Sequence, residues 1–185
     1  MQSKTDLSKY NNDWYKPGAP IIIRAIWYLV NWAFFISYCP FNFLKVFFLR
    51  MFGAKIGKGV VLKPRINIKY PWRLSIGNYS WIGEGAWIDN LDDVVIGANC
   101  CISQGALLLC GNHNFKKSTF DLMTGKIVLE DGAWIGAKSI VCGGVVCKSH
   151  AVLTAGSVAV DSLAPYSIYQ GNPAVKIKDR EITSA

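Results

Sequence analysis

Residues 129–164 read LEDGAW IGAKSI VCGGVV CKSHAV LTAGSV AVDSLA, which is a run of six hexapeptides without a gap. Each hexapeptide opens on an apolar residue, and its fifth residue is usually small. A fixed period indicates a repeat architecture, and a period of six is typical of a parallel β-helix. Each hexapeptide is therefore predicted to form one short strand followed by one tight turn.

The same spacing extends upstream to residue 56 when two extra residues are allowed after every third hexapeptide. Three hexapeptides close one triangular coil, and successive coils stack at the strand spacing of about 4.8 Å. We expect the aliphatic residues to stack inside five coils, with the small residues beside them. The Gly that often follows the aliphatic residue is expected to supply backbone geometry that a Cβ forbids. The fifteen aliphatic positions are Ile56, Leu62, Ile68, Ile76, Ile82, Ile88, Ile96, Ile102, Leu108, Leu129, Ile135, Val141, Cys147, Leu153 and Ala159.

The spacing breaks once, between Leu108 and Leu129, where the step is 21 residues instead of 6. The 15 additional residues, 114–128, are predicted to form a long loop, and such a loop on a solenoid is usually either functional or disordered. His113 stands immediately before it. A neutral imidazole, with an ordinary pKa near ~6.5, can take a proton from a hydroxyl group, so His113 is our candidate general base. A loop-ordering role for His113 is the alternative.

The chain has two His and six Cys, with no Cys-x-x-Cys pair. One subunit cannot supply the three imidazoles that solenoid carbonic anhydrases place on zinc, and zinc-finger spacing is missing, so we expect no metal site. The second imidazole, His150, falls at a variable turn position and is expected to be exposed. The Cys residues are predicted to be free thiols that serve as small apolar side chains, which is typical of the reducing cytoplasm.

With 185 residues, 51% hydrophobic and 17% charged, the chain has the length of one domain and is too apolar to be disordered. The formal net charge is +8, and residues 1–55 contribute +5 of it, from seven basic and two acidic side chains. This region also holds the most apolar stretch, residues 21–52. There Pro40 is expected to separate two helices of about 17 and 12 residues. We assign residues 1–54 to an N-terminal helical segment.

A basic and apolar segment suggests an anionic membrane surface before it suggests nucleic acid, so we expect no nucleic-acid partner. Three alternatives stay open for residues 20–52: packing against the solenoid, peripheral contact with a membrane, and spanning of the bilayer. A cleavable signal peptide is not expected, because the apolar run starts about 20 residues into the chain and lacks a small-residue cleavage site. The protein is expected in the cytoplasm, with association at the inner face of the membrane left open.

Several segments together resemble the hexapeptide-repeat acetyltransferases, in particular the O-acetyltransferases of colanic acid and exopolysaccharide biosynthesis. They are IGEGAWIDNLDDVVIGANCCISQGALL (82–108), GNHNF with STFDL (111–115 and 118–122), IVLEDGAWIGAKSIV (127–141) and APYSIYQGNPAVKIKDR (164–180). The resemblance implies a left-handed parallel β-helix over residues 55–185, with the loop at 114–128 and a C-terminal tail at 164–185. It also implies a homotrimer that binds acetyl-CoA between adjacent subunits, and an acceptor that is a sugar hydroxyl of a glycan or lipid-linked saccharide.

The family's catalytic His falls on His113. By their position in the family pattern, the residues expected to contact acetyl-CoA are Trp134, Gly136, Ala137, Ala155, Val160, Lys176 and Lys178. Which of the two Lys meets the CoA phosphates stays open, because Val175 stands where the family commonly has a basic residue. The polar residues that could face the sugar or orient His113 are Glu84, Asp89 and Asn90, and a role as solvated turn residues is the alternative.

Trp81 and Trp87 are expected to point outward and to pack against a neighbouring subunit, with acceptor stacking as the alternative. Two other functions stay open. One is a non-catalytic scaffold or regulatory subunit that kept the fold, and the other is an acyltransferase with another acyl donor or an amine acceptor. Binding of acetyl-CoA separates the first from an acetyltransferase, and the mass of the product separates the second.

Overall fold

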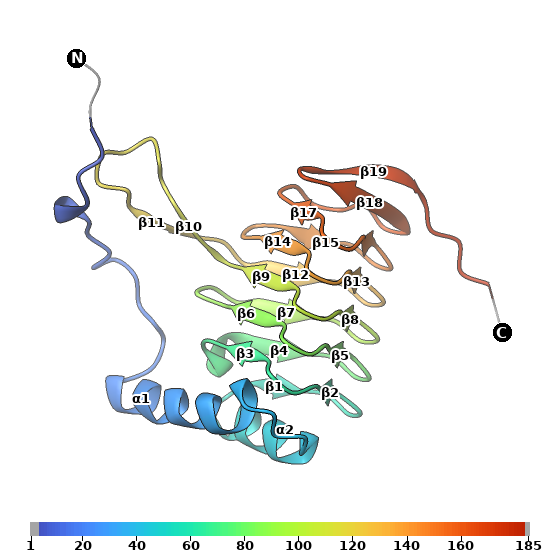
Figure 1. Ribbon diagram of the computed structural model, residues 1–185, viewed down its shortest axis with the longest axis horizontal. Coiled ribbons are helices and arrows are strands. Elements are labelled where there is room, and N and C mark those ends of the chain that lie inside the picture. Colours follow the sequence, from blue (N-terminus) through green and yellow to red (C-terminus); the bar gives the residue numbers. More distant parts are fainter. Residues whose placement is uncertain (1–3, 184–185) are drawn as a thin grey trace.

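The computed structural model describes residues 4–183, which form a triangular stack of coils with helices at one end and a hairpin at the other (Figure 1). One face contains β1 (Lys55–Ile56), β4 (Leu74–Ile76), β7 (Val94–Ile96), β12 (Ile127–Leu129) and β15 (Val146–Cys147). The second contains β2 (Val61–Leu62), β5 (Trp81–Ile82), β8 (Cys101–Ile102), β13 (Trp134–Ile135), β16 (Val152–Leu153) and β18 (Ser167–Gly171), with β19 (Ala174–Asp179) antiparallel at its edge. The third contains β3 (Asn67–Ile68), β6 (Trp87–Asp89), β9 (Leu107–Leu109), β14 (Ile140–Cys142) and β17 (Val158–Ala159).

Strand register places the predicted aliphatic positions directly above one another. Ile82, for example, pairs with Ile102, and Ile102 pairs with Ile135. All fifteen predicted positions are buried. The mainly β fold of five stacked coils is confirmed, and β18, which pairs with β16, begins a sixth within the tail assigned to residues 164–185. The core is continuous because the inward side chains stack on their equivalents in the neighbouring coils, one strand spacing away.

The Gly after the aliphatic residue has a different role from the one expected. The φ of Gly136 lies outside the left-handed region, but a Cβ there would stand 2.5 Å from the backbone nitrogen of Ala155 on the next coil. The left-handed positions fall later in the turn, at Lys138 (φ 55°) and Gly156 (φ 69°). Gly136 is therefore required by the close approach of two coils and not by its own dihedral angles.

The helices close the end of the solenoid that has no further coil to pair with. α1 (Ile21–Val30) continues into a π-helix, η2 (Asn31–Ile36), and α2 (Asn42–Met51) follows Pro40, so two helical stretches are present as predicted. Trp27 Nε1 donates to Ile68 O at 2.9 Å, and Lys45 Nζ donates to Lys63 O at 2.8 Å. These side chains satisfy carbonyl groups of the first coil that have no strand beneath them.

Among residues 4–20 the segment before α1 forms one short 3-10 turn, η1 (Leu7–Lys9), and no α-helix, so the two expected helices account for the helical part of residues 4–54. Pro17, Gly18 and Pro20 disfavour a helix here. Trp72, in the 3-10 turn η3 (Pro71–Arg73), donates through Nε1 to Pro17 O at 2.7 Å and ties this segment to the solenoid. Within the described residues, none of the helices has the length and apolar character needed to cross a bilayer.

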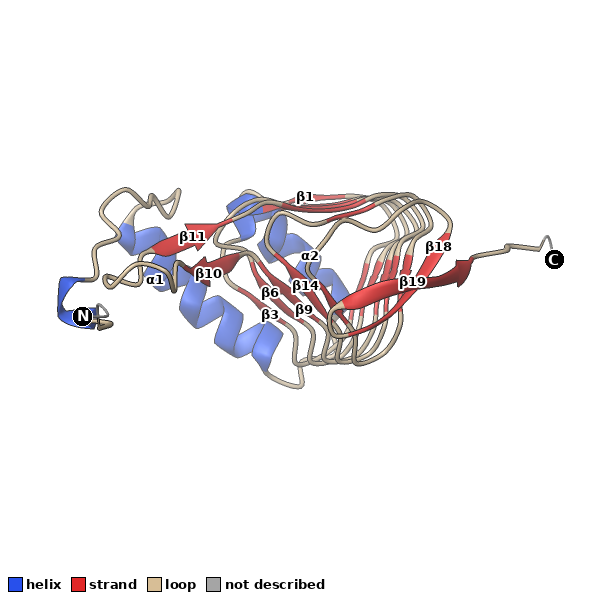
Figure 2. Cartoon of the chain, turned by 90° about the horizontal axis from the view of Figure 1, so that it is seen from above, coloured by secondary structure: helices blue, strands red, loops and turns tan. Residues whose placement is uncertain are grey.

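The inserted loop is a two-stranded arm. β10 (Gly111–His113) pairs antiparallel with β11 (Leu122–Thr124), and His113 lies opposite Leu122. β12 then begins at Ile127, so Ile127 and Val128, which were assigned to the loop at 114–128, belong to the first face, where β12 pairs with β7. The spacing alone could not place the boundaries, because any window of 15 residues between Leu108 and Leu129 restores the same period. Figures 1 and 2 both show the arm projecting from the solenoid on the side of α1.

Candidate functional site

His113 is the last residue of β10 and is half-buried on the arm. Its Nδ1 lies 2.9 Å from the carbonyl oxygen of Phe120, across the hairpin. A carbonyl oxygen only accepts hydrogen bonds, so the neutral ring carries its proton on Nδ1. Nε2 is then the basic nitrogen, and no hydrogen bond within residues 4–183 occupies it. His113 is thus held in the tautomer that a general base requires.

Two aromatic rings fix the plane of this imidazole. The Phe120 ring stacks on it with centroids 4.5 Å apart and planes 8° apart, and the Tyr10 ring stands tilted at 5.9 Å. Tyr10 arrives from the N-terminal segment, which is held to the arm by the bond from the Asp6 N–H to Ser118 O at 2.8 Å. Sequence spacing gave no sign of the contact between Tyr10 and His113. The two residues lie 103 positions apart, and Tyr10 belongs to a segment without a repeat.

Asp89 lies at the base of the arm. It ends β6 on the coil below, and its carboxylate pairs with Lys69 Nζ at 2.9 Å. A Cβ on Gly111, two residues before His113, would stand 3.9 Å from Asp89 Oδ2. Of the three polar residues that were expected to face the sugar or orient His113, Asp89 is therefore the one that the fold places beside the arm.

Asn90 has a structural role. It is fully buried, its Oδ1 accepts from the Tyr70 N–H at 2.9 Å, and its Nδ2 donates to Tyr70 O at 2.6 Å. Both sides of the amide thus already have a partner in the Tyr70 backbone, and the buried side chain has no exposed surface. Glu84 lies elsewhere, exposed on the turn from β5 to β6, with its Oε1 4.0 Å from Arg65 Nη1. Within one chain Glu84 and Asp89 stand at different corners of the triangle.

A groove follows the corner between the second and third faces. Its volume is about 490 Å³, and Trp81, Ser103 and Trp134 are among its lining residues. The Trp134 ring is exposed and donates through Nε1 to Ser103 Oγ at 2.9 Å, while register places it beside Cys101 and, through it, Trp81. Trp81 and Trp87 point outward on either side of this corner, as expected, and both are exposed.

The turns at this corner present backbone donors. The N–H groups of Ala137 and Ala155 have no hydrogen-bond partner within residues 4–183, whereas the Gly136 N–H donates to Leu153 O at 2.7 Å. Ala137 and Ala155, on successive coils, thus offer free N–H groups to an extended ligand. The Gly136 N–H is already used within the chain.

A line of paired residues leads from Trp134 to the edge of the same face. Trp134 pairs with Val152, Val152 with Ile168, and Ile168 with Lys178 on β19. Lys178 has no carboxylate within 4 Å among the described residues, whereas Lys176 Nζ lies 2.7 Å from Asp179 Oδ1 and this contact raises the pKa of Lys176. Lys178 is therefore the uncompensated cation of the two.

Val160 stands apart from this line. It follows β17 and is 47% exposed. The arm leaves the solenoid at the same corner, but two coils before Val160. His150 lies at the remaining corner, where its ring stacks on Tyr166 with centroids 4.7 Å apart. The predicted site residues thus divide between two corners: His113 with Asp89 and Val160, and Trp134 with Ala137 and Ala155.

Comparison with known proteins supports one family for this fold. No family model matches the chain. A protein of Escherichia coli strain K12 described as the colanic acid biosynthesis acetyltransferase WcaF is 38% identical over 136 residues, which cover 74% of this chain and 75% of that protein.

Two solved structures have the same fold. The hexapeptide-repeat acetyltransferase VCA0836 of Vibrio cholerae, in complex with acetyl coenzyme A, superposes with a TM-score of 0.79 at 17% identity and covers 87% of this chain and 88% of that one. A galactoside acetyltransferase in complex with coenzyme A gives 0.77 at 18% identity, over 86% of this chain and 82% of that one. On the sequence relation to WcaF together with this fold, the chain belongs to the hexapeptide-repeat acetyltransferases.

Proposed function

We propose that this protein transfers an acetyl group from acetyl-CoA to a hydroxyl of a glycan or lipid-linked saccharide, with His113 as the general base. The observation that carries the proposal is the state of the His113 ring. Its Nδ1–H is directed at Phe120 O, and its Nε2 is free to accept a proton. The sequence relation to WcaF, described as a colanic acid biosynthesis enzyme, supports a saccharide acceptor.

In this reaction His113 Nε2 takes the proton of the sugar hydroxyl while the oxygen attacks the thioester carbonyl carbon. The tetrahedral intermediate then breaks its carbon–sulfur bond, and the leaving thiolate receives the proton from Nε2, so that the O-acetyl sugar and CoA are released. The Phe120 carbonyl stabilises the imidazolium formed between these steps, because it accepts the hydrogen bond from Nδ1–H.

The donor site is proposed along the corner that carries Trp134. An extended pantetheine can accept hydrogen bonds from the Ala137 and Ala155 N–H groups and lie against the Trp134 ring. Lys178 stands three strand spacings, about 14 Å, farther along the same face, where it would meet the CoA phosphates. The structures that superpose on this chain include complexes with acetyl-CoA and CoA.

A homotrimer would bring the two halves of the site together. Within one chain His113 and the Trp134 groove belong to different corners of the triangle, so each half needs the other from a neighbouring subunit. The exposed rings of Trp81 and Trp87 flank the groove corner and are suited to packing against that neighbour. Glu84, which lines the groove, then reaches the acceptor beside the His113 of the adjacent subunit.

On the acceptor side we assign Asp89 and Tyr10. The Asp89 carboxylate can accept a hydrogen bond from a sugar hydroxyl, and the Tyr10 ring offers an apolar wall beside the base. The six Cys are free thiols, which suits a reducing compartment and supports a cytoplasmic location.

The proposal is tested by His113→Ala with His150→Ala as the matched control, since these are the two histidines of the chain. We expect His113→Ala to lower kcat by about 10²–10⁴-fold, because general-base catalysis contributes that much, and to leave the thermal shift with acetyl-CoA intact. His150→Ala should retain turnover, because its ring stacks on Tyr166 at another corner.

Wild-type turnover in His113→Ala would refute the mechanism. A wild-type protein without any acetyl-CoA shift would instead point to a scaffold. A product that carries a longer acyl group, or an acetylated amine, identified by mass, would replace the proposed donor or acceptor.

A further inference from the structure

The two helices at the end of the stack expose a large apolar surface, which we call the end face. In the described residues 4–183, thirteen of the twenty-six exposed large apolar side chains fall within residues 21–51. Monomeric soluble proteins rarely keep such a concentration uncovered. The end face consists of Ile21, Ile22, Ile23, Ile26, Tyr28, Leu29, Trp32, Ile36, Tyr38, Phe41, Phe43, Phe47 and Met51.

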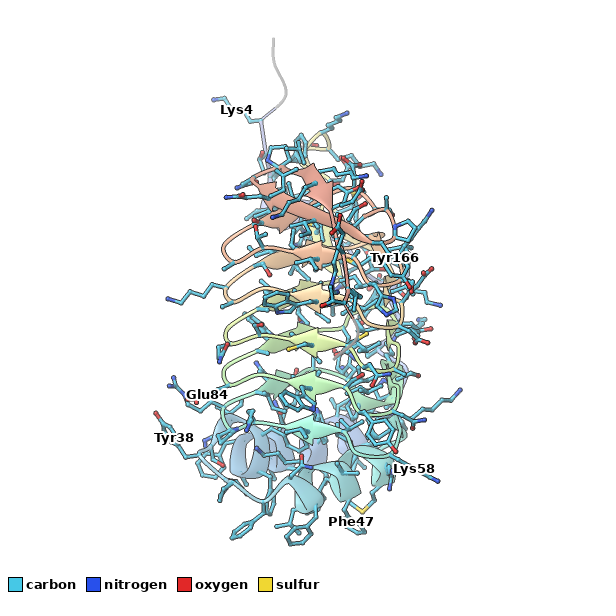
Figure 3. The ribbon with its side chains drawn as sticks, turned by 90° about the vertical axis from the view of Figure 1, so that its right-hand side faces the viewer. Lys4, Tyr38, Phe47, Lys58, Glu84 and Tyr166 are labelled. Carbon is cyan, nitrogen blue, oxygen red and sulfur yellow. The ribbon has the colours of Figure 1, made fainter. Side chains whose placement is uncertain are left out.

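The solenoid does not need these side chains for its own packing. α1, η2 and α2 already bury Trp27, Phe35 and Leu49 against the first coil. A helix that packs by one face normally turns a polar face to water, but here the outer faces are apolar too. Phe47 points away from the coils at the helix end of the molecule, with Tyr38 and Lys58 at its two sides (Figure 3).

The surroundings of the end face are strongly basic. Residues 14–83 contain ten Lys and Arg and no Asp or Glu. Lys55, Lys58 and Lys63 are exposed on the first coil, next to the helices, and within residues 4–183 none of them has a carboxylate partner within 4 Å. The apolar surface is therefore bordered by cations that the rest of the chain does not neutralise.

A groove between α2 and the first turn of the solenoid combines both features. It has a volume of about 680 Å³ and is lined by Phe43, Phe47 and Met51 together with Arg50 and Lys58. The Arg50 guanidinium donates to Ile56 O at 2.8 Å, which holds this cation at the rim. Apolar floor and basic rim match the order of acyl chains and anionic headgroups in a leaflet.

We propose that the end face docks on an anionic lipid bilayer, with α1 and α2 lying in the plane of its surface. Docking is separate from acetyl transfer, because none of the end-face residues belongs to the proposed site. The helices are too short to cross a bilayer but are suited to its interface. Charge argues against a second copy of the chain as the occupant, since two such faces would bring two sets of unpaired cations together.

The test is co-sedimentation with phosphatidylcholine vesicles, with and without phosphatidylglycerol. We expect retention on the anionic vesicles and little on the neutral ones, and retention should fall as salt is raised. Trp32→Glu with Phe47→Glu should lower the partition coefficient by at least about tenfold, because each change removes an inserted apolar side chain and adds a negative charge. These side chains are 70% and 58% exposed, so the fold is expected to tolerate the changes.

Matched controls separate docking from general effects. Ile182→Glu places the same charge on an exposed apolar residue near the C-terminus and should bind as wild type. Lys58→Glu should lose about fivefold or more, whereas Lys148→Glu, at the same corner four coils away, should lose little. We expect acetyl-CoA to raise the Tm of every variant as much as it raises that of the wild type. A loss of vesicle binding would then be independent of the proposed acetyl transfer.

Equal retention on neutral and anionic vesicles would overturn the proposal, as would wild-type binding by the Trp32→Glu/Phe47→Glu variant. Light scattering could also overturn it. If the mass of the wild-type protein is twice that of the Trp32→Glu/Phe47→Glu variant, the end face joins two copies of the assembly. The end face would then be an interface between copies of the chain.

Discussion

Gly136→Ala tests the conclusion that this residue serves coil packing. A Cβ at position 136 would lie 2.5 Å from Ala155 N, 2.6 Å from Thr154 C and 2.7 Å from Leu153 O, whereas ordinary contact begins at 3.4 Å. The shortfall is largest, about 0.9 Å, against Ala155 N, and all three neighbours are backbone atoms that cannot rotate away. Relief requires the two coils to separate, which also stretches the bond from the Gly136 N–H to Leu153 O, now 2.7 Å.

The expected cost is about 3 kcal/mol, from overpacking of about 1–3 kcal/mol and a weakened hydrogen bond of about 1 kcal/mol. In a chain of this length 1 kcal/mol corresponds to about 2–4 °C, so Tm should fall by about 6–12 °C. Gly156→Ala is the control. Gly156 has φ 69° but no atom within 4 Å of a Cβ, so only conformational strain of about 1 kcal/mol is expected, or about 2–4 °C.

The measurement is thermal unfolding followed by circular dichroism, with and without acetyl-CoA. A Gly136→Ala variant that melts within about 2 °C of wild type, or above Gly156→Ala, would refute the packing argument.

Further predictions concern the donor site, the wall beside His113 and the buried thiols. Lys178→Ala should weaken acetyl-CoA binding by about tenfold and Lys176→Ala by much less, because Asp179 already neutralises Lys176; calorimetric titration decides, and equal effects would contradict the assignment. Tyr10→Ala should lower kcat/KM for the saccharide and leave the affinity for acetyl-CoA unchanged, which steady-state kinetics with each substrate varied would show. Burial raises the pKa of Cys110 and Cys147 to about 12 and that of Cys100 to about 11, so the folded state keeps these thiols protonated. Below about pH 9 these thiols are protonated in both the folded and the unfolded state, and their stabilising contribution is complete. As the pH rises toward 12 the unfolded state loses these protons first, so the free energy of unfolding falls, by about 1 kcal/mol for each thiol at pH 10. Tm should therefore drop between pH 8 and pH 10, and a Cys147→Ala variant should lose less over that range.

The coils could be predicted because the period is local. Every hexapeptide has the same two neighbours, one coil below and one above, so a single residue pattern specifies its strand, its inward side chain and its turn. The same logic located His113, since a break in a strict period marks an insertion wherever it occurs. It could not set the ends of the arm, and it misassigned the reason for Gly136, because the spacing between coils is not visible in a hexapeptide.

The assembly of the site was decided by contacts between distant parts of the chain. The tautomer of His113 depends on where the Phe120 carbonyl points, and the Tyr10 contact depends on a segment without any repeat. Asp89 and Asn90 are adjacent in sequence but have different surroundings. The Asp89 carboxylate lies at the base of the arm, whereas the Asn90 amide is hydrogen-bonded to the Tyr70 backbone.

The amino-acid sequence by itself therefore determined the solenoid, the position of its one insertion and the basic, apolar character of the N-terminal helices. Only the tertiary structure decided which faces of those helices stay exposed and that His113 and the Trp134 groove occupy different corners. The physical reason is that periodicity specifies environments that repeat, whereas a site and a docking surface are made where the repetition ends, from side chains whose partners lie far away in sequence.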